Sequence, residues 1–313
     1  PDKRYFTYYN VADTTWYLYD IKSGKTTDLT SNIDDIFWDD QEDMPVLPTP
    51  AGRVQWYEEG DKFVISAKYD MWLFDATGKS SAVSLTEGLG NKTKTRFSIN
   101  ADLLYDTRKD SRSGLSGGGT ILPDRPLILS GFNKVTKESS IYMKDIANPK
   151  AKMKKLVEGP YSYRIAGEVI SYEYPGIEDE SKVRRRPRRE MSIPAIIYTK
   201  GNFENPNDLY ITYDLFRSEQ KLTDINPQQS EYNWGTVEMV YWKTEDGIDA
   251  EGLLYKPEDF DPAKKYPMLI YFYEKDSDEL YTYKSPAPSR SIINIPYCVS
   301  NGYIVFVPNI YYK

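Results

Sequence analysis

The sequence predicts a mainly β chain, in which a partial β-propeller is followed by the first strands of an α/β domain. A pattern of aromatic strand, polar turn and Leu-Thr recurs four times before residue 231. Two continuous apolar runs follow near the C-terminus, as expected for buried strands of a parallel sheet. Hydrophobic residues make up 40% of the 313 residues, and 28 of them are Tyr, which is enough for a substantial β-rich core. We therefore expect propeller blades over 1–231 and a second, truncated domain over 232–313.

The repeat has a consistent order and an irregular period. Its four copies begin with an aromatic or apolar strand, continue through a turn and end in Leu-Thr or a close variant; they span 16–30, 71–86, 141–157 and 209–223. The leucines of successive copies, Leu29, Leu85, Leu156 and Leu222, are separated by more than the roughly 40–45 residues of compact propeller repeats. Long loops must therefore intervene.

Further short strands are predicted between the repeats, over 53–57, 62–67 and 126–130. Several strands per period, each group ending in the same two-residue signature, are typical of propeller blades. A β-sandwich whose hairpins resemble one another by chance is the alternative. The recurring order of aromatic strand, Asp and Leu-Thr favours the propeller. The uneven spacing favours a ring of more than four blades, of which this chain contains only a part.

The last 80 residues lack the repeat and predict a different kind of sheet. Strands are predicted over 236–244 and 248–255, joined by a turn at Glu245-Asp246-Gly247. The run MLIYFY over 268–273 predicts a strand buried on both faces, 296–300 a short helix that stops at Gly302, and 303–308 another buried strand. A parallel sheet needs more strands and helices than these, so we expect 303–308 to have an unpaired edge through which the chain could associate.

Composition excludes several classes of function. The net charge of −7 disfavours nucleic acid as a partner, because phosphate binding relies on clustered Lys and Arg. No apolar run reaches the roughly 18 residues of a membrane-spanning helix. The chain begins at Pro1, so we expect any export signal to lie upstream or to have been removed. The single cysteine, Cys298, lies in an apolar helical segment and is expected to be a core residue without a reactive thiol.

The sequence contains no histidine. Serine and cysteine nucleophiles commonly use histidine as their base, and zinc sites usually need histidine or several cysteines. We therefore expect no metal, no cofactor and no independent catalytic activity in this chain.

Four segments together resemble the prolyl oligopeptidase family of serine peptidases, in its dipeptidyl-peptidase-IV-like branch. They are YDMWLFDATG (70–79), VSLTEGLG (83–90), GLLYKPEDFDPAKKYPMLIYFY (252–273) and PSRSIINIPYCVSNGYIVFVPN (288–309). The resemblance implies a seven- or eight-bladed propeller joined to an α/β hydrolase domain that cleaves short peptides, after proline or with broader specificity. It also implies an extracytoplasmic location and a peptide substrate as the partner. The nucleophilic Ser, the Asp and the His would lie beyond Lys313, so this chain would be a fragment of the enzyme.

The resemblance assigns one functional residue, Tyr273. In this family, the strand that follows a Lys-Tyr-Pro sequence, here Lys265-Tyr266-Pro267, ends in a tyrosine whose hydroxyl stabilises the oxyanion. A fixed phenol aimed at a developing negative charge lowers the barrier of acyl transfer. The alternative is that Tyr273 only packs at the strand end, as Tyr271 would. Relatives have a glycine-rich turn after this tyrosine, whereas the segment here is 274-EKDSD-278.

Three further motifs have simpler interpretations than a site. The sequence over 114–118 matches G-x-S-x-G but lacks the flanking strand and helix of a nucleophile elbow. The pair Glu58-Glu59 resembles the glutamates that bind a substrate amino terminus, yet it leads into Gly60-Asp61 and is expected to be a hairpin turn. The basic run KVRRRPRR over 182–189 follows an acidic triplet and is expected to be a solvated loop.

A rival from another class is a non-enzymatic propeller that binds peptides or proteins, with the last 80 residues as a degenerate appendage. The sequence downstream of Lys313 discriminates between the two hypotheses. A G-x-S-x-G after a strand, followed by Asp and then His, would support the peptidase.

Overall fold

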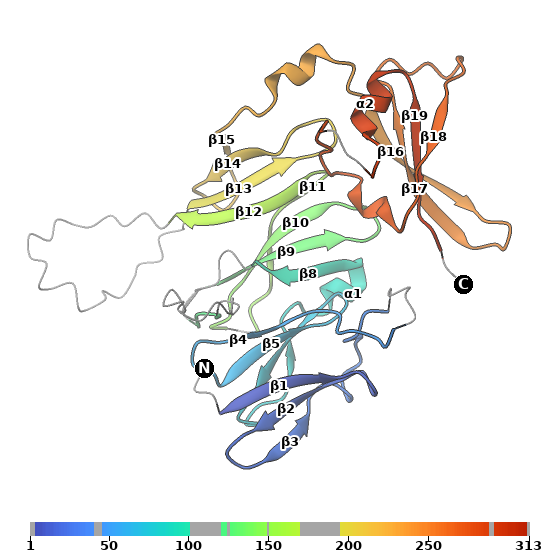
Figure 1. Ribbon diagram of the computed structural model, residues 1–313. Helices are drawn as coiled ribbons and strands as arrows, with labels where there is room; N and C mark the ends of the chain where they lie inside the picture. Colours follow the sequence, from blue (N-terminus) through green and yellow to red (C-terminus); the bar gives the residue numbers. More distant parts are fainter. Residues whose placement is uncertain are drawn as a thin grey trace, which may run out of the picture.

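The computed structural model describes residues 4–40, 46–100, 120–123, 126–148, 150–169, 195–287 and 291–311. This part of the chain is mainly β, as predicted, and forms five separate sheets with short helical segments between them (Figure 1). The first four sheets are antiparallel, and in each of them the strands lie side by side in sequence order.

The strands of the first four sheets are short and follow one another closely along the chain. The first sheet holds β1 (Tyr5–Asn10), β2 (Thr15–Asp20) and β3 (Lys25–Asp28). The second holds β4 (Val54–Trp56), β5 (Lys62–Ser66), β6 (Met71–Asp75) and β7 (Val83–Ser84), and α1 (Leu89–Thr93) follows it. The third holds β8 (Thr95–Ile99), β9 (Leu127–Asn133), β10 (Ser139–Lys144) and β11 (Lys154–Gly159). The fourth holds β12 (Ser162–Val169), β13 (Ala195–Gly201), β14 (Asp208–Thr212) and β15 (Gln220–Lys221).

Each predicted repeat forms the last two strands of one sheet. The four copies become the antiparallel pairs β2–β3, β6–β7, β10–β11 and β14–β15. The strands predicted over 53–57, 62–67 and 126–130 are present as β4, β5 and β9. Sequence order and sheet order therefore agree throughout this region.

The threonine of the Leu-Thr signature has a structural role, which we call the threonine clip. Its hydroxyl oxygen accepts a hydrogen bond from the backbone N–H at the start of the aromatic strand of the same repeat. The clips pair Thr30 with Trp16 at 3.0 Å, Thr86 with Met71 at 2.9 Å and Thr223 with Leu209 at 2.8 Å. A side-chain hydroxyl thus closes the open end of three of the four hairpins, whereas the third copy ends in Leu156-Val157.

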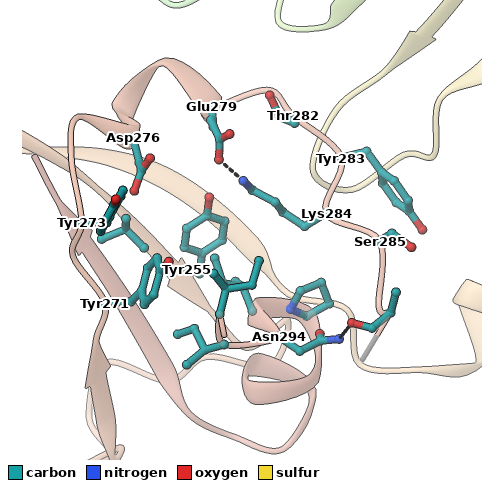
Figure 2. A pocket seen from close by; sticks show the side chains of 16 residues that line it. Tyr255, Tyr271, Tyr273, Asp276, Glu279, Thr282, Tyr283, Lys284, Ser285 and Asn294 are labelled. Carbon is teal, nitrogen blue, oxygen red and sulfur yellow. Dashed lines mark hydrogen bonds and ion pairs between the residues drawn. The ribbon is translucent and has the colours of Figure 1, made fainter. Parts of the chain in front are cut away.

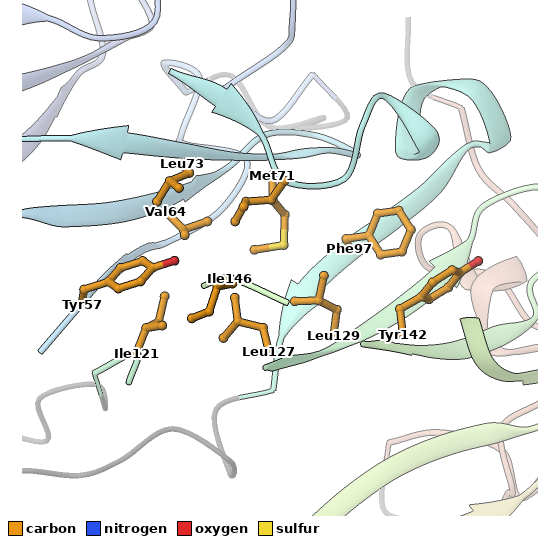
Figure 3. Packing of buried hydrophobic residues seen from close by; sticks show 11 residues of the cluster. Tyr57, Val64, Met71, Leu73, Phe97, Ile121, Leu127, Leu129, Tyr142 and Ile146 are labelled. Carbon is orange, nitrogen blue, oxygen red and sulfur yellow. The ribbon is translucent and has the colours of Figure 1, made fainter. Parts of the chain in front are cut away.

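Successive sheets pack face to face. In β5, Phe63 and Ile65 face the first sheet and contact the cluster around Trp16, whereas Val64 faces the third sheet. This alternation follows from the two-residue period of a strand and makes β5 apolar on both sides. In the second cluster, Met71 packs near Phe97 and Leu129 of the third sheet (Figure 3). A further cluster around Ile141, Ile196 and Tyr198 joins the third sheet to the fourth.

The fifth sheet is mixed. It follows the 3-10 turn η3 (Pro227–Glu231) and comprises β16 (Thr236–Lys243), β17 (Asp249–Lys256), β18 (Met268–Ile270) and β19 (Ile304–Pro308), in the order β16-β17-β19-β18. The strands β18 and β19 are parallel. Parallel strands need a crossover connection, which here contains the 3-10 turn η4 (Asp276–Glu279) and helix α2 (Ile295–Ser300).

Helix α2 confirms the predicted short helix and its signals. Asn294 caps its start by accepting a hydrogen bond from the N–H of Tyr297 at 3.0 Å, and Pro296 occupies its first turn. The chain leaves the helix through Gly302, whose φ of 80° is readily available to glycine. Residues of α2 pack on the fifth sheet in a cluster with Trp234, Leu253 and Val305.

Two expectations for this sheet are wrong. The run 268–273 was expected to be buried on both faces, but β18 covers only its first three residues, and Met268 and Ile270 are 50% and 60% exposed. The strand 303–308 was expected to have an unpaired edge, but β19 lies between β17 and β18. The crossover through α2 places the earlier strand outside the later one, so β18 is the edge strand.

In the described part of the chain, no helix has the length and apolar character needed to cross a bilayer.

Candidate functional site

A cavity of about 410 Å³ lies on the face of the fifth sheet that α2 covers, next to the end of β18. Its walls come from β17, β19, η4, the following segment and the start of α2 (Figure 2). Four tyrosines line it: Tyr255, Tyr271, Tyr273 and Tyr283. Ligands of α/β sheets bind beside the carboxyl ends of parallel strands, so this is the expected place for a site.

Tyr273, the one site residue predicted from sequence, lies at this cavity. Its side chain is 71% exposed, and it follows β18 by three residues rather than ending the strand. The backbone is held on both sides of it. The N–H of Tyr271 donates to the carbonyl of Phe306 at 2.9 Å, and the carbonyl of Glu274 accepts from the N–H of Ile310 at 3.0 Å.

The polar end of the cavity is formed by η4 and the segment after it. Glu279 forms an ion pair with Lys284, and Asp276 lies near both Lys284 and Tyr255 (Figure 2). Burial lowers the pKa of the Lys284 ammonium, and the carboxylate of Asp276 partly offsets this effect. Burial and then the charge of Asp276 raise the pKa of the Tyr255 hydroxyl, which therefore stays protonated.

The turn η4 is held in place by a buried polar network. Ser277 is 2% exposed; its N–H donates to Asn309 Oδ1 at 2.9 Å, and its hydroxyl donates to Glu251 Oε1 at 2.6 Å. Lys137, from the turn between β9 and β10, donates to Glu251 at 2.8 Å and to Asp278 at 3.2 Å. The third sheet thus contacts the same segment that supplies the cavity wall.

Sequence reasoning missed this network. Lys137 lies in a polar hairpin turn, yet its side chain is only 3% exposed and its φ is 63°. Its partner Glu251 is 114 residues further along the chain. Nothing in the local sequence distinguishes this lysine from a solvated turn residue.

The other sequence candidates do not join this site. Glu58 and Glu59 are exposed in the turn between β4 and β5, where the N–H of Gly60 donates to the carbonyl of Tyr57 at 3.0 Å, as expected for a hairpin. Cys298 packs against the core cluster of the fifth sheet, and burial raises the pKa of its thiol. The motif at 114–118 and the basic run at 182–189 lie outside the described residues.

Comparison with known proteins identifies relatives through structure alone. No protein-family model matches the chain, and no curated protein matches it in sequence. A structure from Bacteroides ovatus, assigned as a dipeptidyl aminopeptidase IV, is 14% identical with a TM-score of 0.52, over 99% of this chain and 40% of that chain. A post-proline cleaving enzyme from Rickettsia typhi is 12% identical with a TM-score of 0.47, over 95% of this chain and 36% of that chain.

The chain spans about two fifths of the length of these solved proteins. Other similar structures are prolyl endopeptidases and a dipeptidyl peptidase 4 from Porphyromonas gingivalis. At these identities the likeness concerns the fold. Over nearly its whole length, this chain shares the fold of part of a dipeptidyl aminopeptidase IV-like protein.

Proposed function

We propose that this chain is part of a serine peptidase of the prolyl oligopeptidase family, with blades of a β-propeller over 1–231 and the beginning of an α/β hydrolase domain over 232–313. The face-to-face stacking of four small antiparallel sheets supports the propeller assignment. The parallel unit β18–α2–β19 supports the hydrolase assignment. The observation that carries the proposal is the fold likeness over 99% of the chain.

The chemistry would be acyl transfer to a serine. A serine from the remainder of the domain would attack a peptide carbonyl, and a histidine would take its proton and later protonate the leaving amine. In this scheme, Tyr273 donates a hydrogen bond to the oxyanion from a backbone pinned on both sides. The propeller restricts access to short peptides. Because the chain has no histidine, the 313 residues alone would not perform the proton transfer.

A serine-reactive fluorophosphonate probe tests the proposal. We expect the longer protein that contains this sequence to be labelled and to cleave short peptides. We expect the 313-residue chain to remain unlabelled. A longer protein that binds peptides without labelling would favour the non-enzymatic propeller instead, and labelling of the chain alone would contradict its predicted inactivity.

The role of Tyr273 has its own test in the longer protein. Tyr273→Phe removes only the hydroxyl and should lower kcat by about 10²-fold or more, as expected for an oxyanion donor. Tyr271→Phe, at the neighbouring tyrosine of the same cavity, serves as the matched control and should change kcat much less. Equal effects of the two substitutions would remove the special role of Tyr273.

A further inference from the structure

At the polar end of the cavity, two side chains, Tyr255 and Asp276, form no side-chain hydrogen bond with another described residue. Tyr255 is 1% exposed, and Figure 2 shows its hydroxyl rising from the sheet toward the space between Asp276 and Lys284. Among the described residues, none forms a hydrogen bond with this hydroxyl or with the carboxylate of Asp276. The hydroxyl faces the cavity, so a bound ligand can exchange a hydrogen bond with it in place of water.

The charges at this end favour a cation. Two carboxylates of the cavity wall, Asp276 and Glu279, share the single ammonium of Lys284, which leaves one negative charge in excess among these three groups. A carboxylate accepts hydrogen bonds and donates none, and a tyrosine hydroxyl can also accept. The rings of Tyr271 and Tyr273 add electron-rich faces, which attract ammonium groups.

Part of the cavity wall is apolar. Ile292, Ile295 and Pro296 line it, together with Val307 from β19. The volume of about 410 Å³ falls within the range of small-molecule sites and can hold one amino-acid residue. A ligand that fits both the polar end and this wall has an ammonium group beside an aliphatic side chain.

We propose that this cavity binds a primary ammonium group carried by a peptide, with Asp276 as the counter-ion, the Tyr255 hydroxyl as a second acceptor and the adjoining side chain on the apolar wall. The assignment of the ligand as a peptide rests on the proposed function. Two sources of the group share this chemistry, namely the amino terminus of the peptide and a lysine side chain.

Three small probes distinguish these sources in binding measurements on the 313-residue chain by ligand-observed NMR. Leucine amide has a free α-ammonium, N-acetyl-leucine amide has no cation, and N-acetyl-lysine amide has its ammonium on the side chain. We expect at least one of the two cationic probes to bind about tenfold or more tightly than N-acetyl-leucine amide, as a charge-assisted hydrogen bond predicts. Preference for leucine amide identifies the amino terminus, and preference for the lysine probe identifies the side chain.

Asp276→Asn tests the counter-ion while keeping the shape of the side chain. It should reduce the preference for the cationic probe to within about twofold, because the charged acceptor is lost. Glu274→Gln, at an exposed carboxylate two residues earlier that does not line the cavity, is the matched control and should keep the preference. Tyr255→Phe should weaken cation binding several-fold, and circular dichroism confirms the fold of each variant.

Three outcomes would overturn the inference: equal binding of the neutral and cationic probes, binding of none of them, or an unchanged preference in the folded Asp276→Asn variant. None of these outcomes depends on catalysis. If the longer protein is labelled by fluorophosphonate but the 313-residue chain shows no preference for the cationic probes, the peptidase proposal stands and the cavity assignment fails. If the chain prefers the cationic probes but the longer protein is not labelled, the cavity assignment stands and the peptidase proposal fails.

Discussion

Thr86 and Asp70 explain at the residue scale why a two-residue signature recurs in this sequence. Both side chains are almost fully buried, at 0% and 1% exposed. The Thr86 hydroxyl donates to Asp70 Oδ1 at 2.6 Å while accepting from the N–H of Met71. Asp70 also accepts from the N–H of Gly90 at 2.9 Å. One threonine therefore completes the hydrogen bonding of a buried carboxylate and of a strand end.

Replacing this hydroxyl should destabilise the second sheet. Thr86→Val keeps the shape of the side chain but leaves the Met71 N–H and the Asp70 carboxylate each short of a partner. We expect a loss of about 1–3 kcal/mol in the free energy of unfolding, measured by urea denaturation. Thr77→Val, at an exposed threonine that also bonds an aspartate, should cost less than about 0.5 kcal/mol. Similar losses at both positions would show that burial is not the reason for the signature.

The equivalent carboxylate of the fourth sheet, Asp208, gives a pH-dependent prediction. Burial raises its pKa, but hydrogen bonds from Lys221, the N–H of Ile225 and Thr223 outweigh this effect, so its net pKa is lowered. A lowered native pKa stabilises the fold above the ordinary value near 3.8, and this contribution is lost as the pH falls through the native pKa.

Asp208→Asn should therefore be less stable than the parent near neutral pH and should lose less stability on acidification. Urea denaturation of both proteins, between about pH 6 and the lowest pH at which the parent stays folded, measures this difference. Asp259→Asn provides a control at an exposed carboxylate. An unchanged pH slope in Asp208→Asn would refute the role of this carboxylate.

Residue-scale features were only partly readable from sequence. The Leu-Thr pairs were visible as a repeat, but their hydrogen bonds were not, since the bonded residues lie 14 or 15 positions apart. Tyr273 could be placed beside a strand end because of the resemblance. The cavity beside Tyr255 could not be foreseen, because a tyrosine within the strand 248–255 has the same pattern whether or not a cavity adjoins it.

At the scale of elements, the sequence predicted which strands and helices exist better than it predicted their positions in the sheets. The hairpins, α2 and β19 follow from local patterns, turn residues and caps. The burial of the run 268–273 was predicted wrongly, because apolar composition shows that a strand can be buried but does not show which elements cover it. Its three-residue strand pairs with β19 on one side. The order of β18 and β19 depends on the crossover, which local pattern does not encode.

The turn between β9 and β10 is the element that links the third sheet to the fifth. Lys137 and Lys134 both bond Asp278, but their side chains are 3% and 33% exposed. An ion pair with a buried ammonium and one whose two members are both partly exposed differ in what they lose when they are broken. Loss of a buried partner leaves an uncompensated charge, whereas solvent screens an exposed one.

Lys137→Met should therefore cost about 1.5–3 kcal/mol in the free energy of unfolding, because the partly exposed carboxylates of Glu251 and Asp278 lose the hydrogen bonds of a buried ammonium. Lys134→Met is the matched control in the same turn and should cost about 1 kcal/mol or less. Adding Asp278→Asn to Lys137→Met should recover part of the loss, which a double-mutant cycle measures. Equal costs for the two lysines would contradict the buried network.

At the scale of the whole molecule, the four stacked sheets bury apolar residues on facing surfaces, while the fifth sheet leaves one edge apolar. Met268, Ile270 and Phe272 are 50%, 60% and 61% exposed at or just after β18. The open edge was expected on the strand 303–308, and this expectation is wrong because β19 is paired with both β17 and β18. The number of sheets that complete the proposed ring is a property of contacts between sheets, which repeat spacing alone does not determine.

An apolar edge strand is a template for pairing with another chain, so the 313-residue chain should associate as its concentration rises. Ile270→Lys places a charge on this edge and should shift sedimentation-velocity profiles toward the monomer at equal concentration. Val135→Lys is a matched control, because Val135 is also 60% exposed but lies in the turn between β9 and β10. If both lysines reduce association equally, net charge rather than the edge governs it. If neither lysine reduces association, β18 is not the surface through which the chain associates. A strand of three residues would then be too short to pair with a second chain.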